Sequence, residues 1–438
     1  MLNIKFFVLA VTVLMYALVI LFQQKKAYAS ICAAVLILIV ESIFPDWAGA
    51  ARLGVVEALT VSISWSVLLI YVGSLMIAEL FIYSKMPARI ADNIVCVSPN
   101  SGIAIVIILI ITGIISAFVE NVATVLVMAP IALALSKKTK ISPVYFMIGL
   151  AVMSNLQGTA TLVGDPPSMI FANFAEYKFN DFFFYNKKIS IFFFVQIGMI
   201  TGALFFYFLF AKKGKGKVLV EKEKIISVIP SVLFGLMIVG LASFSFILNK
   251  GVSIEAGLFV FLLGAAGLLW YKIAQKKSTQ TVFKLVKGLD WETIFFITGI
   301  FVVIGALEKT GVLHDFALFL ESVIGENIFL GFIIIILVSV IISGFVDNVP
   351  YIIAMLPVAK TLSEGLSLSP ELFMFGLLIG SCLGGNLTPF GASANIVAVG
   401  LLKKEGISLR FSGWLKIGLP FTFVTTTAAA LSLWFVWR

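Results

Sequence analysis

Residues 116–130 read SAFVENVATVLVMAP and residues 154–169 read SNLQGTATLVGDPPSM, and these two strings decide the fold. The same pattern returns as SGFVDNVPYIIAMLP at 343–357 and SCLGGNLTPFGASANI at 381–396. The matched residues are Ser116 and Ser343, Glu120 and Asp347, Asn121 and Asn348, Pro130 and Pro357, Gly158 and Gly385, Thr161 and Thr388, and Gly164 and Gly391. Every pair is 227 positions apart (343 − 116 and 391 − 164). One register held over so many Gly, Pro and acidic positions indicates a gene duplication, and we expect the function to lie where the two copies meet.

The composition is that of a membrane protein. The chain has 438 residues, of which 61% are hydrophobic and 12% charged, and its mean hydropathy is +1.12. A soluble domain is about half apolar, so most of this surface is expected to face lipid. The net charge of +9 is attributed to basic loops on one side of the membrane rather than to nucleic-acid binding. Three Cys and one His form neither a disulfide framework nor a His-based metal site.

Ten apolar segments are long enough to cross a bilayer as helices of about 17–25 residues. The first half supplies 4–22, 28–44, 65–83, 141–176 and 189–211, and the second half supplies 226–247, 254–273, 291–308, 371–402 and 415–437. The run at 6–22 is interpreted as a span and not as a signal peptide, because Lys25 and Lys26 separate it from the small residues that follow.

Two further apolar stretches, 102–136 and 327–363, are each interrupted by an acidic residue followed by Asn. Each stretch fits either two spans joined by a tight turn or a re-entrant hairpin that enters and leaves on one side. The arm from Val122 to Ser136 has 15 residues, which is short for a span and favours the hairpin. Counted without the hairpins, each half has five crossings. Because five is odd, the halves insert in opposite orientations, as in the inverted repeats of secondary transporters.

The predicted fold is therefore an all-α polytopic membrane protein built from two inverted-topology repeats. Each repeat has five transmembrane helices, a re-entrant hairpin and a broken helix. The repeats occupy residues 1–211 and 226–438, and a basic cytoplasmic linker joins them at 212–225.

The basic residues support this layout. Of the 31 Lys and Arg residues, 22 fall on one side, which the positive-inside rule makes cytoplasmic. Lys25 and Lys26, between the first two spans, count among them. Both termini then face outward, the first hairpin opens from the cytoplasm and the second opens from outside. The compact chain indicates a prokaryotic plasma membrane.

Two motifs break the fourth span of each half. In GTATLVGDPP at 158–167, two prolines remove backbone donors and the glycines lower the cost of unwinding. Asp165 before Pro166 is typical of a helix N-cap followed by Pro at the first helical position. We expect one half-helix to end near Gly158 and another to start at Asp165, and GGNLTPFGAS at 384–393 repeats the pattern with one proline. Such a break turns unwound carbonyls and helix ends toward a cavity. We therefore interpret it as part of an ion-binding site rather than as a simple kink.

Three carboxylates fall at membrane depth in this scheme: Glu120, Asp165 and Asp347. A carboxylate there is costly and usually serves a pathway or a partner. Each acid is also placed to cap the helix that follows it, and the two roles are compatible. No Lys or Arg lies within either hairpin tip or either break. The site is therefore better suited to a cation, a proton or a neutral hydroxylated species, although an anion would still find helix N-termini and Asn and Thr donors.

Neutral oxygens accompany these acids in the candidate binding site. Its members are Glu120, Asn121, Thr124, Asn155, Gly158, Thr159, Thr161, Gly164, Asp165, Asp347, Asn348, Gly385, Asn386, Thr388, Ser393 and Asn395. Hard cations favour oxygen ligands of this kind, and the positions considered for Na⁺ are Asn121, Thr161, Asn348 and Thr388. No cofactor is expected apart from Na⁺ or H⁺ as a coupling ion.

The paired motifs resemble those of a known family. ENVAT at 120–124, GTAT at 158–161 and GDPP at 164–167 resemble the ArsB/NhaD permeases of the ion transporter superfamily, which also includes the citrate and dicarboxylate symporters. DNVP at 347–350 and GGN…GASAN at 384–395 fit as well, so the resemblance covers essentially the whole chain. It implies inverted repeats, a substrate site between hairpin tips and broken helices, a homodimer, and elevator-type movement of a transport domain against a dimeric scaffold.

The tips also differ from one branch of that superfamily. In the dicarboxylate symporters the hairpin tips carry Ser-Asn-Thr, whereas this chain has Glu120-Asn121-Val122 and Asp347-Asn348-Val349. The difference argues against a dicarboxylate substrate. The string GDPP looks more like the arsenite-permease and P-protein branch.

We therefore expect an ion-coupled secondary active transporter of a small inorganic ion or oxyacid, by an elevator mechanism. Arsenite or antimonite export and Na⁺/H⁺ exchange are its two concrete versions. A sodium-coupled carboxylate or citrate-like symporter is the alternative, and a channel is less favoured because duplicated broken helices suit alternating access. An enzyme is not expected, since a single His offers no nucleophile–base pair, and ATP-driven pumping is disfavoured because no phosphate-binding loop appears. A soluble ATPase partner, as for some arsenite permeases, stays open.

Overall fold

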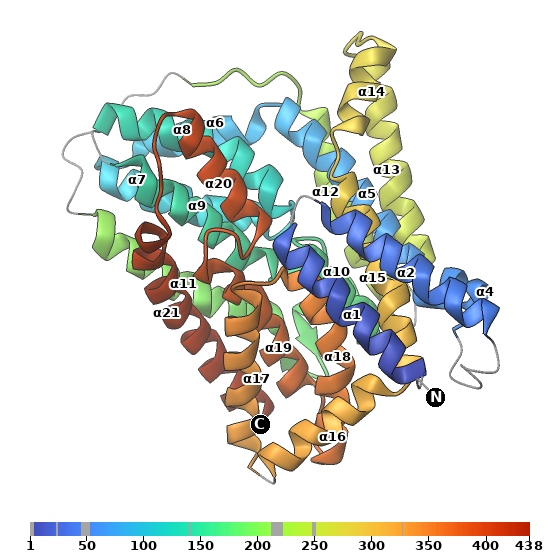
Figure 1. The fold of residues 1–438 in the computed structure, drawn as a ribbon. Coiled ribbons are helices and arrows are strands. Elements are labelled where there is room, and N and C mark those ends of the chain that lie inside the picture. Colours follow the sequence, from blue (N-terminus) through green and yellow to red (C-terminus); the bar gives the residue numbers. More distant parts are fainter. Residues whose placement is uncertain are drawn as a thin grey trace.

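The structure is a computed structural model, and it describes residues 4–22, 25–44, 53–139, 142–211, 222–247, 251–325 and 327–438. The described chain is almost entirely helical (Figure 1). The elements of the first half are α1 (Ile4–Leu21), α2 (Lys26–Ile43), α4 (Val55–Glu57), η3 (Ala58–Ser62), α5 (Trp65–Tyr83), α6 (Met86–Val97), α7 (Ser101–Ser116), α8 (Asn121–Thr139), α9 (Pro143–Gly158), α10 (Pro166–Phe174), η4 (Phe179–Phe182), β1 (Phe184–Tyr185), β2 (Lys188–Ile189) and α11 (Ile191–Phe210). Those of the second half are α12 (Ile229–Ile247), α13 (Ile254–Ile273), α14 (Thr279–Lys287), α15 (Trp291–Lys309), α16 (Val312–Ile324), α17 (Ile328–Ser343), α18 (Asn348–Gly365), α19 (Glu371–Gly384), η5 (Gly385–Leu387), α20 (Ser393–Lys404) and α21 (Phe411–Trp437).

The two halves present equivalent elements in the same order. Helix α8 starts at Asn121 and α18 at Asn348, which is the 227-residue shift of the sequence motifs. The same shift relates α1 to α12, α2 to α13, α5 to α15, α6 to α16, α7 to α17, α9 to α19, α10 to α20 and α11 to α21, within a few residues. The halves also exchange partners, because α13 packs against α5 and α2 packs against α15. The duplication thus extends over the whole chain.

The predicted hairpins are present as α7–α8 and α17–α18. Their arms α7 and α17 have 16 residues each, about 24 Å of helix, which is less than the roughly 30 Å of a bilayer core. Figure 1 shows α7–α8 in the upper half of the molecule and α17–α18 in the lower half. Hairpins that enter from opposite ends are the arrangement expected of inverted repeats, so the predicted fold class is confirmed.

Each broken helix unwinds where the sequence predicted. The first half-helix α9 ends at Gly158 and α10 starts at Pro166, while α19 ends at Gly384 and α20 starts at Ser393. Close packing of backbone requires glycine in both breaks. A Cβ at Gly164 would lie 2.5 Å from the Gly158 carbonyl oxygen, and a Cβ at Gly391 would lie 2.6 Å from that of Gly385.

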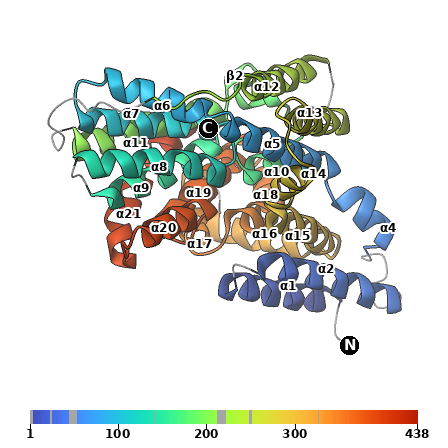
Figure 2. The same ribbon diagram turned by 90° about the horizontal axis from the view of Figure 1, so that it is seen from above.

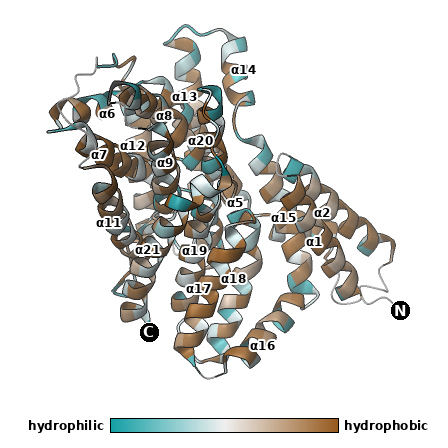
Figure 3. Ribbon diagram, turned by 60° about the vertical axis from the view of Figure 1, so that its left-hand side comes forward, coloured by the Kyte–Doolittle hydropathy of each residue, from teal (hydrophilic) through white to brown (hydrophobic). Residues whose placement is uncertain are grey.

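Eight of the described helices are long and apolar enough to cross a membrane: α1, α2, α5, α11, α12, α13, α15 and α21. They correspond to the eight unbroken spans expected from sequence, and the two broken helices make ten. Hydrophobic residues cover the outer helices (Figure 3). On α12, Phe246 is 84% exposed and Val239 is 62% exposed, as is appropriate for a helix that faces lipid.

Several elements were not predicted. The short helices α6, α14 and α16 join the spans to the hairpins or to one another, and a two-stranded antiparallel ribbon pairs Phe184 with Ile189. Of the predicted linker at 212–225, residues 212–221 lie outside the described residues. From there the chain runs along α6, where Glu223 N donates to Asp92 Oδ2 over 2.8 Å.

Figure 2 shows how the helices are grouped around the site. Helices α1 and α2 lie at one edge, α12 and α13 lie at another, and α5 and α15 lie between them. The hairpins and broken helices fill the remaining side. This grouping brings both hairpin tips and both breaks next to α5 and α15.

Candidate functional site

The two hairpin tips and the two breaks meet around a small cavity at the centre of the molecule. Its volume is ≈ 20 Å³, about enough for one water molecule or a bare ion. The cavity is lined by Lys26, Tyr71, Glu120, Asn121, Asn155, Asp165, Pro166, Asp290, Thr293, Asp347, Asn348, Val349, Ala392, Ser393 and Ala394. Both repeats contribute residues, so this cavity lies where the two copies meet.

Glu120 and Asp347 occupy the tips and cap the helices that follow. The backbone N–H of Ala123 donates to Glu120 Oε2 over 2.9 Å, and that of Val349 donates to Asp347 Oδ1 over 3.1 Å. Each carboxylate keeps its other oxygen for a further partner. Capping and a role in the cavity are therefore combined in the same residue.

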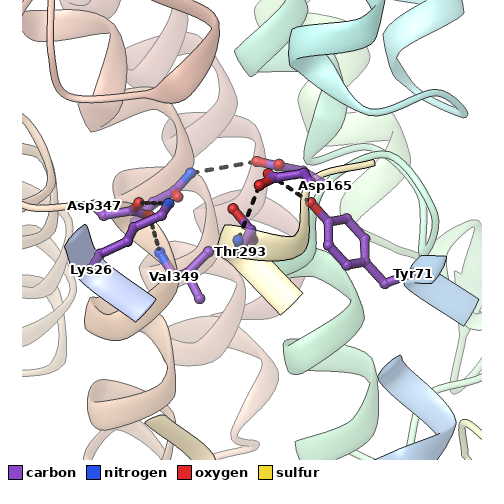
Figure 4. A network of polar contacts seen from close by, with 8 residues as sticks. Lys26, Tyr71, Asp165, Thr293, Asp347 and Val349 are labelled. Atoms are coloured by element: carbon purple, nitrogen blue, oxygen red, sulfur yellow. Dashed lines mark hydrogen bonds and ion pairs between the residues drawn. The ribbon is translucent and has the colours of Figure 1, made fainter. Parts of the chain in front are cut away.

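Asp165 acts differently from what its sequence context indicates. It is the N-cap residue of α10 by backbone position, but its side chain makes no capping hydrogen bond. The carboxylate instead accepts from Asn348 Nδ2 over 3.4 Å, across the boundary between the repeats. Asp165 is buried, and its carboxylate points into the cavity that the opposite tip helps to form (Figure 4).

Lys26 is the cation of the site, so the expectation of a site with acids and no fixed cation is wrong. Its ammonium lies 2.8 Å from Asp347 Oδ2, and its side chain is only 11% exposed. The ammonium also lies 5.1 Å from the centre of the Phe296 ring. Figure 4 shows the pair at one side of the cavity, with Asp165 opposite. No sequence signal distinguished Lys26 from Lys25, because the depth at which α2 begins is set by tertiary packing.

Asp290, Tyr71 and Thr293 complete the cavity and were also not predicted. Asp290 caps α15, accepting from the Thr293 backbone N–H over 3.0 Å. The Tyr71 hydroxyl donates to Asp290 Oδ2 over 3.4 Å. An acid just before a long apolar helix was a readable signal, since Asp290 precedes the span that begins at Trp291.

Three asparagines join the two broken helices behind the cavity. Asn155 Nδ2 donates to Asn386 Oδ1 and to Asn395 Oδ1, both over 2.9 Å. Asn395 in turn donates to the carbonyl oxygens of Gly385 and Thr388, each over 2.8 Å. Within the described chain, Asn155 Oδ1 is buried without a hydrogen-bond partner. That oxygen belongs to a residue that lines the cavity and is available to a ligand.

Serine and threonine hydroxyls fix each tip to its own broken helix. The Thr161 hydroxyl donates to the Ala117 carbonyl, and the equivalent Thr388 hydroxyl donates to the Gly344 carbonyl. These contacts place hydroxyl and carbonyl oxygens side by side in each repeat.

Serines behind the tips also make equivalent hydrogen bonds in the two repeats. Ser154 donates to the carbonyl of Asn121 over 3.2 Å, and Ser381 donates to that of Asn348 over 3.4 Å. The threonine contacts and the serine contacts are therefore both repeated at the 227-residue shift.

The predicted site residues thus divide into two groups. Those that line the cavity are Glu120, Asn121, Asn155, Asp165, Asp347, Asn348 and Ser393. Those that lie behind it and hold its walls are Thr124, Gly158, Thr159, Thr161, Gly164, Gly385, Asn386, Thr388 and Asn395.

Two larger cavities lie on opposite sides of the tips. One, of ≈ 500 Å³, lies between η3, α10, α15 and α18 and is lined in part by Ile353 and Pro357. The other, of ≈ 300 Å³, lies between α5, α6 and α8 and is lined in part by Leu126 and Pro130. These residue pairs are equivalent by the 227-residue shift, and Figure 1 shows α8 in the upper and α18 in the lower half. The same structural position is therefore hollow in both repeats.

Comparison with known proteins identifies the family. The CitMHS citrate transporter family matches residues 9–380, so the chain belongs to that family, within the ion transporter superfamily. An uncharacterized transporter of Mycobacterium tuberculosis is 30% identical over 387 residues, covering 85% of this chain and 86% of the relative. The human P protein is 25% identical over 410 residues, covering 74% of this chain and 47% of that longer protein.

Solved structures share the fold. The YdaH transporter of Alcanivorax borkumensis aligns with a TM-score of 0.60 at 12% identity, covering 98% of this chain and 97% of that one. MtrF of Neisseria gonorrhoeae aligns with a TM-score of 0.53 at 14% identity, covering 91% and 83%. The chain is a membrane transporter, which agrees with the expectation that it is not an enzyme.

Proposed function

We propose that this member of the citrate transporter family is a secondary active transporter that binds a cation or a proton between its two hairpin tips. The observation that carries the proposal is the charge of the central cavity. Four carboxylates line it, those of Glu120, Asp165, Asp290 and Asp347, against the single ammonium of Lys26. A surplus of buried negative charge is costly unless a mobile cation or a proton offsets it.

The oxygen sets beside the tips provide two positions for Na⁺ as coupling ion. In the first repeat, Asn121 Oδ1, the Thr161 hydroxyl and the carbonyl oxygens of Ala117 and Gly158 lie close together. In the second repeat, the Thr388 hydroxyl lies beside the Gly344 carbonyl. A set of neutral oxygens is the donor type that a hard cation takes. The Asn348 amide donates to Asp165.

The transported substrate that fits this cavity best is a small inorganic ion or oxyacid. Na⁺/H⁺ exchange would use Glu120 and Asp165 as carboxylates that alternately hold a proton and a metal ion. Export of arsenite or antimonite would use the Asn amides and Ser393 to bind a neutral hydroxylated species. The resemblance of the tip motifs to the ArsB/NhaD permeases and the similarity to P protein support this branch.

A sodium-coupled carboxylate or citrate-like symporter is the second candidate. Lys26 and the N-termini of α10 and α20 at the cavity favour it, because an ammonium and free backbone donors attract carboxylates. The description of the family as citrate transporters supports it as well. This candidate requires that bound cations first offset the surplus of carboxylates.

We propose movement of the elevator type. Two cavities, of ≈ 500 Å³ and ≈ 300 Å³, lie on opposite sides of the tips, and in this proposal each becomes a route to the central site when the tip beside it moves. A hairpin and broken-helix unit that slides along α5 and α15 would open one route while it closes the other. The protein would work as a homodimer in a prokaryotic plasma membrane with both termini outside.

Purified protein in sealed proteoliposomes with an internal pH dye tests the function. Na⁺, Li⁺, arsenite, phosphate and citrate are added one at a time under an imposed proton gradient. A pH change on adding Na⁺ or Li⁺ is the expected result for exchange, and gradient-dependent movement of arsenite is that for metalloid export. Movement of citrate that depends on Na⁺ would instead establish the symporter. Protein that is silent to every addition while it retains its fold would contradict the proposal.

A further inference from the structure

Lys26 places a positive charge at the N-terminus of its own helix, where a cation is unfavourable. It is the first residue of α2, where the helix dipole places partial positive charge. It is also buried, at 11% side-chain exposure. A lysine in such a place requires an anionic partner, and Asp347 supplies one over 2.8 Å. The Phe296 ring, 5.1 Å from the ammonium, covers it from α15.

The first hairpin tip has no equivalent of this ion pair, which joins Lys26 of the first repeat to Asp347 of the second. The residue that corresponds to Lys26 is Ser253 (26 + 227), which caps α13 by accepting from the Ala256 N–H. Among the described residues, the ion pairs are Lys5–Asp315, Lys26–Asp347, Lys137–Glu405 and Lys309–Glu57. None of these includes Glu120. The pairing of one tip carboxylate with a lysine is therefore a departure from the repeat and calls for a role of its own.

The ion pair joins the helix group at the edge of the molecule to the second tip, beside a hydrogen bond from the Tyr16 hydroxyl of α1 to the Pro350 carbonyl oxygen of α18 over 2.8 Å. Lys26 belongs to α2, which packs on α1 and α15 at the edge of the molecule (Figure 2). Asp347 lies at the turn between α17 and α18, at the second hairpin tip. Movement of that tip away from α2 separates the two charges. Separation takes the nearest carboxylate from the ammonium, which Asp290 and Glu292 also face, and leaves Asp347 without a cation unless another charge replaces Lys26.

We propose that Lys26 is a tethered counter-ion of Asp347, which holds the second tip against α2 until the coupling cation or a proton takes its place on that carboxylate. The identity of the displacing ion rests on the proposed function; the hold on the tip does not. Lys26 thereby sets the cation affinity of the second tip, because any cation that binds Asp347 competes with the ammonium. The first tip, at Glu120, has no direct ion pair among the described residues and meets the Lys26 ammonium only at longer range.

Cysteine labelling measures the hold on the tip directly. Phe345 and Phe118 are equivalent positions beside the two acids and are both partly exposed. Phe345→Cys and Phe118→Cys are made separately in a background that carries Cys32→Ser, Cys96→Ser and Cys382→Ala. Reaction rates with a soluble maleimide are then compared with and without Lys26→Gln. Lys25 is the exposed neighbour of Lys26, so Lys25→Gln is the matched control with the same change of charge.

We expect Lys26→Gln to raise the labelling rate at position 345 by roughly tenfold, since a largely buried ion pair is worth more than an exposed one. Lys26→Gln leaves the labelling rate at position 118 unchanged. The control Lys25→Gln changes the labelling rate at neither position. Asp347→Asn has the same effect as Lys26→Gln, and the double variant adds nothing, because both remove one interaction. Equal rates in Lys26→Gln and wild type, or additive effects in the double variant, would overturn the proposal.

A second arm separates this proposal from the proposed function. Na⁺, Li⁺ or acid is added to the Phe345→Cys protein, and the coupling ion is expected to accelerate labelling in the presence of Lys26 but not after Lys26→Gln. If none of the three changes labelling while Lys26→Gln still does, the proposed cation coupling fails and the hold on the tip stands. If an ion accelerates labelling equally with and without Lys26, the counter-ion role fails and cation coupling stands.

Discussion

The two hairpin tips share one backbone frame and differ in charge. Thr161 binds the Ala117 carbonyl in the first tip as Thr388 binds the Gly344 carbonyl in the second. Yet Asp347 is paired with Lys26 over 2.8 Å, whereas no described ion pair includes Glu120. The contacts that shape the backbone are kept in both copies, and the side chains that face the cavity have diverged.

Residues at equivalent positions of the two repeats differ in charge and polarity. Asp165 corresponds to Ala392, Asn155 to Cys382 and Lys26 to Ser253 at the 227-residue shift. In each of these pairs, the member that lines the cavity with a charge or an amide belongs to the first half. The first repeat therefore supplies the lysine, Asp165 and Asn155, while the second supplies the opposing tip and Asp290, whose first-half equivalent is Ile63. The following predictions test the shared frame first and then the differences.

The largest effect is expected where the frame is tightest. Gly164→Ala and Gly391→Ala each place a Cβ within 2.6 Å of a carbonyl oxygen, so each should destabilise the protein by about 1–3 kcal/mol. Thermal unfolding in detergent measures the loss. Gly400→Ala is the control, because nothing lies within 4 Å of its Cβ and helix propensity makes it neutral or stabilising. A break that tolerates alanine in one repeat only would show that the frames are not equivalent.

Asn155→Ala should have the next largest effect, since it removes the donor shared by Asn386 and Asn395 and leaves two buried oxygens unpaired. We expect a loss of stability of about 1–3 kcal/mol and slower transport. Cys382→Ala, at the equivalent position, serves as the comparison and should cost less. Equal losses in the two variants would argue against an asymmetric centre.

Thr161→Val and Thr388→Val compare the two oxygen sets. Each variant removes one hydroxyl and its hydrogen bond, so each should cost about 1 kcal/mol of stability. If Na⁺ binds at both tips, each should also raise the Na⁺ concentration for half-maximal transport by roughly threefold to tenfold. A change in one variant alone identifies the tip that binds the ion. Unchanged Na⁺ dependence in both would exclude these hydroxyls as ligands.

The smallest effect is expected at the surface. The Lys5–Asp315 pair lies far from the cavity, with side-chain exposures of 28% and 62%. Asp315→Asn should change stability by less than about 1 kcal/mol and leave transport unaffected. A clear loss of transport would show that α1 and α16 are coupled to the site in a way that the tip comparison does not explain.

Most of the fold was predictable because it repeats. Spans, hairpins and breaks follow from hydrophobic length, from Pro and Gly in the motifs and from one fixed offset, and boundaries such as Gly158 and Asn348 fall where the motifs place them. The short helices α6, α14 and α16 escaped prediction because their apolar faces are too brief to stand out beside the spans.

The candidate site was only half predictable. Glu120, Asp165 and Asp347 stand out as acids in apolar sequence, and all three line the cavity. Lys26 did not stand out, because a lysine between two spans ordinarily lies in solvent and only the packing of α2 against α15 carries it inward. Tyr71 was hidden in a continuous apolar span.

The central claim is that the driving cation or proton binds between the tips, and one flux measurement tests it most directly. Ion-driven transport is measured in proteoliposomes for wild type, Glu120→Gln and Asp347→Asn, with folding of each checked by thermal unfolding. We predict folded variants whose transport falls by at least about tenfold, equivalent to ~1.4 kcal/mol, or no longer depends on the ion. Wild-type rates and wild-type ion dependence in both variants would contradict the account.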